Sequence, residues 1–189
     1  MTSASRPDRL PPMTRETMTD AQRAAADELI AGPRKAVKGP FIPLLRCPEL
    51  MARTGRLGEY LRFDSSLPPR VSEFATLLVA RHWRQQFEWF VHVPLARAAG
   101  TSDETIEALR QGQRPPAMDA TEALVHDYCT ELQRDRVVSD ATWARAVAAF
   151  GEHGAVDLTA LVGYFTMVSM VLEVAHTPHE PNAAVQPLP

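Results

Sequence analysis

The sequence has few of the residues that would give it a redox or metal-binding signature. It contains only two cysteines, Cys47 and Cys129, which are far apart and form no CxxC pair or metal-ligand group. The protein is therefore expected in a reducing, cytoplasmic compartment. Periodic apolar and polar alternation of useful length is also missing, so no β-strand is predicted. The absence of strands leaves an all-α fold as the prediction.

Long runs of basic or of apolar residues are missing as well. The 20 basic and 23 acidic residues give a formal charge of −3, and the only basic cluster is the short Arg34-Lys35 with Lys38. This excludes the basic footprint of a nucleic-acid-binding protein. The longest uncharged run, 158–172, is shorter than the roughly 20 apolar residues of a membrane span. We expect no membrane partner and a buried central helix there.

The length and composition fit one globular domain. The chain has 189 residues, of which 45% are hydrophobic and 23% charged, enough for a substantial core. Residues 1–18 lack the apolar core of a signal peptide and are predicted to form a flexible segment. Residues 19–176 form the predicted helical domain. Residues 177–189 are rich in proline and are expected to be a tail that is loose or draped over a neighbour.

Capping residues and breakers divide the domain into helices that must bury their apolar faces against one another. The expected helices cover residues 21–31, a stretch beginning at Pro48, a region from about 69 to 99, a short helix after Thr101, a helix around 124–132, one capped by Ser139, and a final one from 156 to about 175. Pro94 should kink the third region near Phe90. Gly151 and Gly154 should separate the last two helices.

A polar stripe in the third region is the main candidate for chemistry. Gln85, Glu88 and His92 follow one another at helical spacing, with Arg81 one turn earlier. Such residues share one helix face, while Trp83, Phe87 and Phe90 occupy the opposite face. A narrow polar line on an otherwise apolar helix either borders solvent or builds a polar pocket.

Each member of the stripe has a functional and a structural interpretation. A carboxylate four residues before an imidazole can orient it for proton transfer, but the same spacing also makes an ordinary helix-surface pair. Arg81 can bind a substrate carboxylate, or it can be solvated or paired with Glu88. Gln85 can donate a hydrogen bond to the substrate or make a contact between subunits.

Other aromatic and titratable residues favour structural roles. The tryptophans and phenylalanines of the third region are more typical of a core or interface than of a cofactor site. The remaining histidines show no ligand spacing, and Glu88 with His92 alone supplies too few ligands for a metal ion. We therefore predict neither a metal nor a cofactor.

The sequence resembles the carboxymuconolactone decarboxylase-like superfamily, which includes the alkylhydroperoxidase D-like proteins. The resemblance extends over roughly residues 32–174. It rests on the segments Leu67-Pro68-Pro69-Arg70 before Glu73, Val79-Ala80-Arg81, Phe87-Glu88-Trp89 before His92, Pro94 to Gly100, and Gly163-Tyr164-Phe165-Thr166. It implies a single-domain helical bundle of the alkylhydroperoxidase D-like type, with Glu73 in a proton relay. Glu73 can equally stabilise its helix as a carboxylate near the positive end of the dipole.

The resemblance also bears on the reaction. The peroxidase branch uses a Glu, a CxxC and a His, and the two cysteine positions fall on Gln85 and Glu88 in this chain. A disulfide cycle needs a thiolate and a resolving thiol, so peroxidase activity by that route is disfavoured. The decarboxylase branch carries a Glu four residues before its His, as Glu88 precedes His92. Relatives often show Asn where this chain has Glu173.

The favoured hypothesis is a cofactor-free, decarboxylase-like lyase acting on a small carboxylated molecule. His92 would move the proton, Glu88 and Glu73 would set its charge, and Arg81 and Gln85 would bind the substrate. The alternatives are an alkylhydroperoxidase D-like peroxidase and a non-catalytic oligomer. A homo-oligomer is expected because the apolar surface exceeds what one domain covers, and the resemblance implies a dimer, trimer or hexamer.

Overall fold

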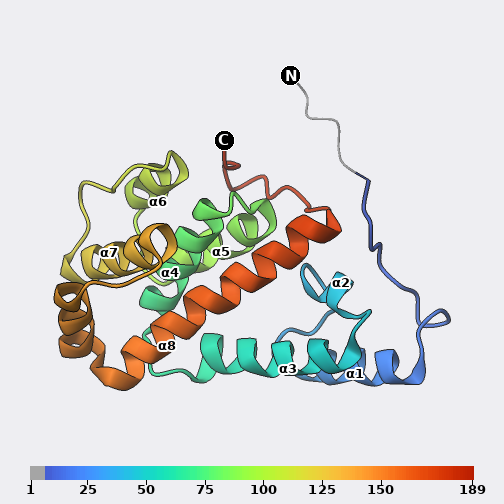
Figure 1. Cartoon of the computed structure of the whole chain (residues 1–189). Helices are drawn as coiled ribbons and strands as arrows, with labels where there is room; N and C mark the ends of the chain where they lie inside the picture. Colours follow the sequence, from blue (N-terminus) through green and yellow to red (C-terminus); the bar gives the residue numbers. More distant parts are fainter. Residues whose placement is uncertain (1–6) are drawn as a thin grey trace.

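The computed structural model describes residues 7–189, and within them it contains eight α-helices, one π-helix and no β-strand. The all-α prediction is confirmed. In chain order the elements are α1 (Asp20–Ala31), α2 (Phe41–Leu44), α3 (Pro48–Glu59), the π-helix η1 (Tyr60–Asp64), α4 (Pro69–His82), α5 (Gln86–Ala98), α6 (Asp103–Arg110), α7 (Ala120–Asp135) and α8 (Asp140–Ala175). The long α8 crosses in front of α4 and α5, while α1 and α3 lie side by side along one edge (Figure 1).

Several helix starts follow directly from local sequence. Thr19 and Gln22 form a reciprocal capping box at the start of α1, which satisfies two otherwise free backbone donors. Pro48 occupies the first turn of α3, where its missing N–H has no cost. Ser139 caps α8 as expected. The short helix expected after Thr101 is α6, and Ser102 caps it.

The third predicted helical region is two helices. α4 ends where Arg84 adopts a left-handed backbone with φ 51°, and the Gln85 N–H donates to the Ala80 carbonyl at 2.8 Å, the closing bond of a Schellman turn. The Gln85 side chain then caps α5 by accepting from the Phe87 N–H at 2.9 Å. Pro94 does not interrupt the helix near Phe90, because α5 continues through Pro94 to Ala98.

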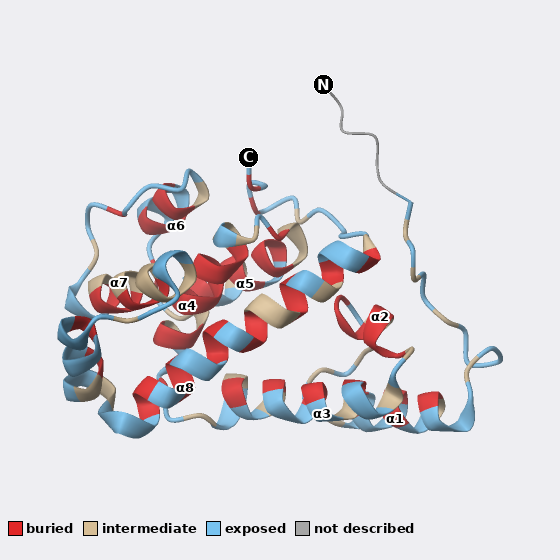
Figure 2. Cartoon of the chain, viewed as in Figure 1, coloured by how far each residue is buried: buried red, intermediate tan, exposed pale blue. Residues whose placement is uncertain are grey.

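The main core surrounds α4. Nearly every residue from 71 to 80 is buried, and α4 packs against α5, α6, α7 and α8. Figure 2 shows this helix red over most of its length, in contrast to the two-sided colouring of α8. The largest fully buried side chains around it include Trp89, Tyr128 and Phe74. The core thus holds α4 and α5 firmly against each other.

A smaller apolar cluster joins α1, α2 and α3. Ala26, Leu29, Phe41, Leu45 and Met51 form its centre. It lies beside α8 but is separate from the main core. The gap between the two clusters is where the polar residues described below converge.

The last helix has a break at the expected place. Gly151 has φ 69° and ψ 172° inside α8, a conformation that suits glycine. The part beyond it contributes Leu158, Leu161, Phe165 and Val168 to the main core. Among the described residues α8 is the one helix long and apolar enough to cross a membrane by length and composition alone, and 56% of its most apolar window is buried within the protein. A core helix passes the same test.

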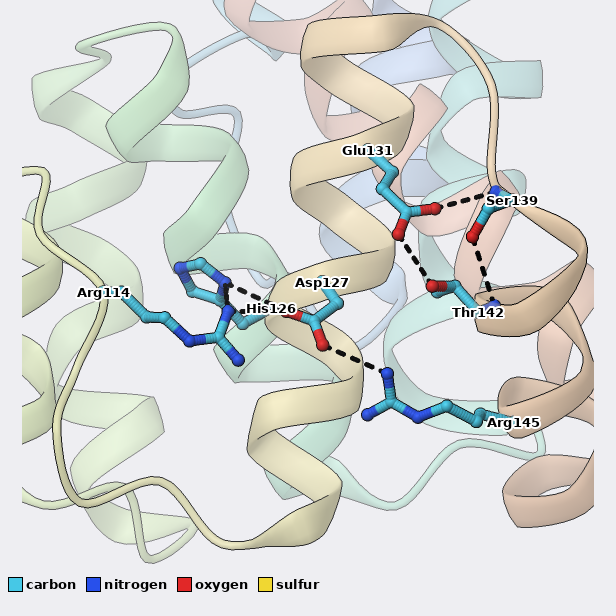
Figure 3. Close-up of polar contacts among 7 residues, drawn as sticks. All are labelled: Arg114, His126, Asp127, Glu131, Ser139, Thr142 and Arg145. Atoms are coloured by element: carbon cyan, nitrogen blue, oxygen red, sulfur yellow. Dashed lines mark hydrogen bonds and ion pairs between the residues drawn. The ribbon is translucent and has the colours of Figure 1, made fainter.

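A polar network fastens α7 to the start of α8 (Figure 3). Glu131 accepts from the Ser139 N–H and from the Thr142 hydroxyl, both at 2.7 Å. One turn earlier on α7, Asp127 accepts from Arg114 and, at 3.1 Å, from Arg145. These contacts fix the loops on either side of α7 by using the α7 carboxylates as anchors.

The end segments lie on the folded domain. Residues 1–6 of the segment expected to be flexible fall outside the described residues, whereas the Arg9 N–H donates to the Ala175 carbonyl at 2.9 Å. The tail 177–189 runs back over its own chain, and Val185 and Leu188 are buried in the main core. The tail is therefore packed in cis on its own domain.

Candidate active site

Two carboxylates flank one buried imidazole. His92 on α5 has 2% of its side chain exposed, and its Nδ1 lies 2.6 Å from Oε2 of Glu73 on α4. Its Nε2 lies 3.4 Å from Oε2 of Glu88, one turn earlier on α5. The first contact is a short, charge-assisted hydrogen bond, whereas the second is an ion-pair contact longer than an ordinary N–H···O bond. The Nε2 proton is therefore near Glu88 without being tightly held by it.

The surroundings of His92 favour its charged form. Burial lowers the pKa of the imidazole, but the hydrogen bonds and negative charges of Glu73 and Glu88 outweigh burial and raise the pKa above its ordinary value. The two carboxylates thus shift the equilibrium of His92 toward the imidazolium. A protonated histidine is a general acid that can deliver a proton.

Aromatic side chains of α8 fix the imidazole from the other side. The Phe165 ring meets the His92 ring edge-on at a centroid distance of 5.0 Å. Tyr164 packs edge-on against Phe165 at 5.3 Å, and its hydroxyl accepts from Arg34 Nη2 at 3.2 Å. Gly58 on α3 makes room for this contact, since a Cβ there would collide with the Tyr164 hydroxyl and with Arg34.

The cluster opens into a cavity of about 260 Å³ between the two apolar clusters. Glu88 and His92 line it, while Glu73 lies behind the imidazole. The other polar and aromatic lining residues include Arg34, Lys38, Phe41, Arg62, Phe87, Tyr164 and Phe165. A concave site with few convergent polar groups and a perturbed histidine has the character of a small-molecule site.

Two arginines give the cavity a positive wall. Arg62 on η1 makes no hydrogen bond or ion pair with any described residue, and its buried Nε has no partner. Its guanidinium carbon lies 5.0 Å from the Phe63 ring centroid, and that of Arg34 lies 4.7 Å from the Phe41 ring centroid. Burial and the neighbouring Arg34 charge lower the pKa of Arg62, against the raising effect of Glu73 and Glu88. Arginine stays protonated nonetheless, so two positive charges that pair with no carboxylate among the described residues face the cavity.

Arg81 is not part of this site. The turn at Arg84 ends α4 before the stripe continues, so Arg81 does not share a helix face with Glu88 and His92. Arg81 lines a different cavity of about 330 Å³, together with Arg114 and His126. The structure thus separates Arg81 from Glu88 and His92, because the shared face predicted for these residues assumed one continuous helix.

Gln85 also points away from the cavity. Its carbonyl oxygen caps α5, and its Nε2 donates to Oε1 of Glu173 on α8 at 3.1 Å. The amide oxygen thus stabilises the start of α5, and the amide nitrogen connects α5 to α8. Gln85 is therefore a structural contact, and Glu173, the position noted as a departure from the relatives, is its partner.

Sequence reasoning missed Arg34, Arg62 and Tyr164. Tyr164 lay within a segment that carried the family resemblance, but its direction depends on α8 crossing α3. Arg62 could have been found from its position next to the end of a helix. It lies in the π-helix η1, and π-helical turns are frequent at functional sites. Arg34 belongs to the basic cluster that was considered only for nucleic acid.

The cysteines and the other acidic and histidine residues add no second reactive centre here. Cys129 is buried, and burial raises the pKa of its thiol, while Cys47 is exposed at the start of α3. Neither lies at the cavity. Within residues 7–189 no three His, Cys, Asp or Glu side chains are grouped to hold a metal ion.

Residues 48–126 match the model of the Carboxymuconolactone decarboxylase family. This segment contains Arg62, Glu73, Glu88 and His92, and the match confirms the resemblance to the carboxymuconolactone decarboxylase-like superfamily. Arg34 and Tyr164 lie outside the matched segment. No curated protein matches the chain.

Proposed function

We propose that this carboxymuconolactone decarboxylase-like protein is a cofactor-free lyase that moves a proton on a small carboxylated substrate. His92 is the proton carrier, Glu73 and Glu88 keep it charged, and Arg62 and Arg34 bind the anionic oxygens of the substrate. These two arginines replace Arg81 and Gln85 in the substrate-binding role.

Proton delivery follows from the unequal contacts of the two ring nitrogens. Glu73 holds Nδ1 at 2.6 Å, whereas the 3.4 Å separation from Glu88 leaves the Nε2 proton available beside the cavity. In a decarboxylation the bond to the leaving carboxylate breaks, carbon dioxide departs, and the electron pair is delocalised into a conjugated carbonyl. The Nε2 proton then goes to the substrate carbon, and His92 regains a proton from water.

The arginines supply the electrostatic part of the reaction. A carbonyl that receives the electron pair becomes an oxyanion, which nearby fixed positive charges stabilise without reorganisation. Arg62 suits this task because it is half-buried and its buried Nε has no partner among the described residues. Arg34 donates to Tyr164 with one nitrogen and keeps other donors for a carboxylate that stays on the substrate.

The single observation that carries the proposal is that an arginine without a carboxylate partner and an imidazole held between two carboxylates meet in one cavity. Buried charges are ordinarily paired, because an unpaired one costs several kcal/mol of solvation. The Arg62 guanidinium lies at the cavity without a carboxylate in contact. An anionic substrate supplies the missing partner.

The proposal is tested with a panel of small β-oxo and α,β-unsaturated carboxylates, including carboxylated lactones. Carbon dioxide release is measured by headspace mass spectrometry, and proton transfer by deuterium incorporation in heavy water. We expect turnover of at least one member, a loss of about 10²-fold in kcat for His92→Ala, and chiefly a raised KM for Arg62→Ala.

Arg81→Ala is the matched control, because it removes an arginine from the same domain outside the cavity. It should leave kcat and KM unchanged. Turnover that survives in correctly folded His92→Ala, or a panel that is neither turned over nor able to shift the His92 imidazole signals, would overturn the proposal.

A further inference from the structure

A second cavity adjoins the first and shares a wall with it. It measures about 650 Å³ and lies between α5, the segment before α2 and the tail. Lys38, Phe87 and Val91 line both cavities. The side chains that line only the outer cavity are mostly apolar and include Ile42, Phe90, Pro94, Pro178, Pro181 and Ala183. The two cavities are therefore adjacent along α5, with these three side chains between them.

Phe87 stands at the junction. Its ring lies directly against the backbone of Gly39, where a Cβ would collide with the ring carbons. Gly39 also has φ 55°, which disfavours any other residue. The absence of a side chain at position 39 thus lets the aromatic ring form the partition between the inner and outer cavities.

The tail builds the far wall of the outer cavity and is firmly attached. The Trp89 indole N–H donates to the Gln186 carbonyl at 2.9 Å. Gln86 donates to the Leu188 carbonyl at 2.8 Å and accepts from its N–H at 3.1 Å. With Val185 and Leu188 buried, the tail residues before them are held in place as a lining surface.

The two cavities differ in charge. The inner cavity carries Arg34, Arg62 and Lys38 against the single carboxylate of Glu88, whereas in the outer cavity Lys38 is balanced by one acidic side chain, Glu180, beside an apolar lining. A carboxylate is therefore attracted more strongly to the inner end. An apolar group finds burial in the outer cavity and would leave the inner arginines unpaired.

We infer that the substrate is an amphipathic carboxylate whose head lies against Arg62 in the inner cavity and whose apolar part extends past Phe87 into the outer cavity. This inference rests on the proposed function for the position of the head. The tail 177–189 is then part of the substrate site, with the apolar chain or ring of the substrate as the occupant of its groove.

The test uses a homologous series of straight-chain carboxylates from butanoate to decanoate, with binding measured by isothermal titration calorimetry on the full chain. Each methylene buried in an apolar cavity should tighten binding by up to about fourfold. We expect affinity to rise with chain length until the outer cavity is filled.

Two neighbouring tail variants distinguish binding in the outer cavity from nonspecific hydrophobic binding elsewhere on the surface. Ala183 lines the outer cavity and is exposed, so Ala183→Trp should fill the groove without disturbing the core. Ala183→Trp should abolish the increase in affinity with carboxylate chain length and leave the affinity for butanoate unchanged. Ala184→Trp is the matched control, since Ala184 is exposed but does not line the cavity, and it should behave as the wild type.

Arg62→Ala distinguishes the two proposals. It should weaken all members of the series by the same factor. An affinity that is independent of chain length, or a gain that persists in Ala183→Trp, would overturn the amphipathic substrate while leaving the inner site intact. Binding that grows with chain length but ignores Arg62→Ala would instead remove the anion site of the proposed function.

Discussion

Oε2 of Glu73 lies 2.6 Å from Nδ1 of His92, although a helix break separates the two residues in the chain. The contact exists because α4 and α5 pack against each other after the turn at Arg84. Glu73 thereby orients the imidazole from behind and leaves Nε2 to the cavity. The charge of the ring is thus set in part by a residue that does not line the cavity.

Glu73→Gln should lower the pKa of His92, because it keeps a hydrogen-bond acceptor beside Nδ1 but removes the negative charge that favours the imidazolium. The basic limb of the kcat profile should move to lower pH with it. NMR titration of the His92 ring signals measures the pKa directly. Glu104→Gln, at an exposed position on α6, is the control. An unchanged titration would contradict a positioning role for Glu73.

His92→Ala and Glu88→Gln should each reduce turnover by about 10²-fold with the fold retained. If the pair acts as one unit, the double variant should be little worse than either single variant. Steady-state kinetics on variants with wild-type circular dichroism provide the comparison. If the pair is only structural, the variants should instead lower Tm and keep their activity per folded subunit.

Stability should fall as the pH rises through the His92 titration. The folded-state pKa is raised above an unfolded value of about 6.5, so the stabilisation is fully present below about pH 6.5 and is lost above it. Urea unfolding between pH 6 and pH 10 measures this dependence. The difference between wild type and His92→Gln isolates the contribution of this residue, and parallel pH curves for the two proteins would refute it.

Gly58→Ala should lower Tm and weaken carboxylate binding, because the added methyl group would displace the Tyr164 hydroxyl and Arg34. Gly163→Ala is the matched control on α8, where a Cβ meets nothing within 4 Å. That substitution should raise stability by about 0.5–1 kcal/mol through helix propensity alone. Thermal unfolding and calorimetric titration test both, and equal stabilisation by the two substitutions would contradict the close approach at Gly58.

Alkylation should modify one cysteine per native chain and leave any turnover intact. Cys47 is exposed and Cys129 is buried, and burial raises the pKa of the Cys129 thiol, which suppresses its reactive thiolate. Mass spectrometry after iodoacetamide treatment counts the adducts, with urea-unfolded protein as the two-adduct reference. Loss of turnover at one adduct would revive a thiol mechanism.

Local signals predicted much of the fold. Caps at Thr19 and Ser139, the proline at Pro48 and the break at Gly151 act through nearby backbone groups, so the sequence places them within a residue or two. The break between α4 and α5 was missed, because Arg84 adopts a left-handed conformation without glycine or proline to mark it. The neighbouring bond from Gln85 to Ala80 that stabilises this turn depends on the formed helix.

The candidate site was predictable in its reactive half only. Glu88 and His92 are one helical turn apart, so their proximity follows from spacing alone, and the resemblance supplied Glu73. Arg62 and Tyr164 reach the cavity through the packing of distant elements, which periodicity cannot describe. Arg81 was predicted to share a face with Glu88 and His92 for the same reason that the helix break was missed. Helical spacing no longer predicts where a side chain points once the backbone turns at Arg84.

The cavity wall combines residues from inside and outside the matched segment 48–126. Glu88 and His92 belong to the segment, whereas Arg34, Lys38 and Tyr164 belong to the flanking chain. Substitutions or length changes in the flanks can therefore reshape the cavity without touching Glu88 and His92. The lining of the cavity can diverge in evolution independently of the segment that matches the family.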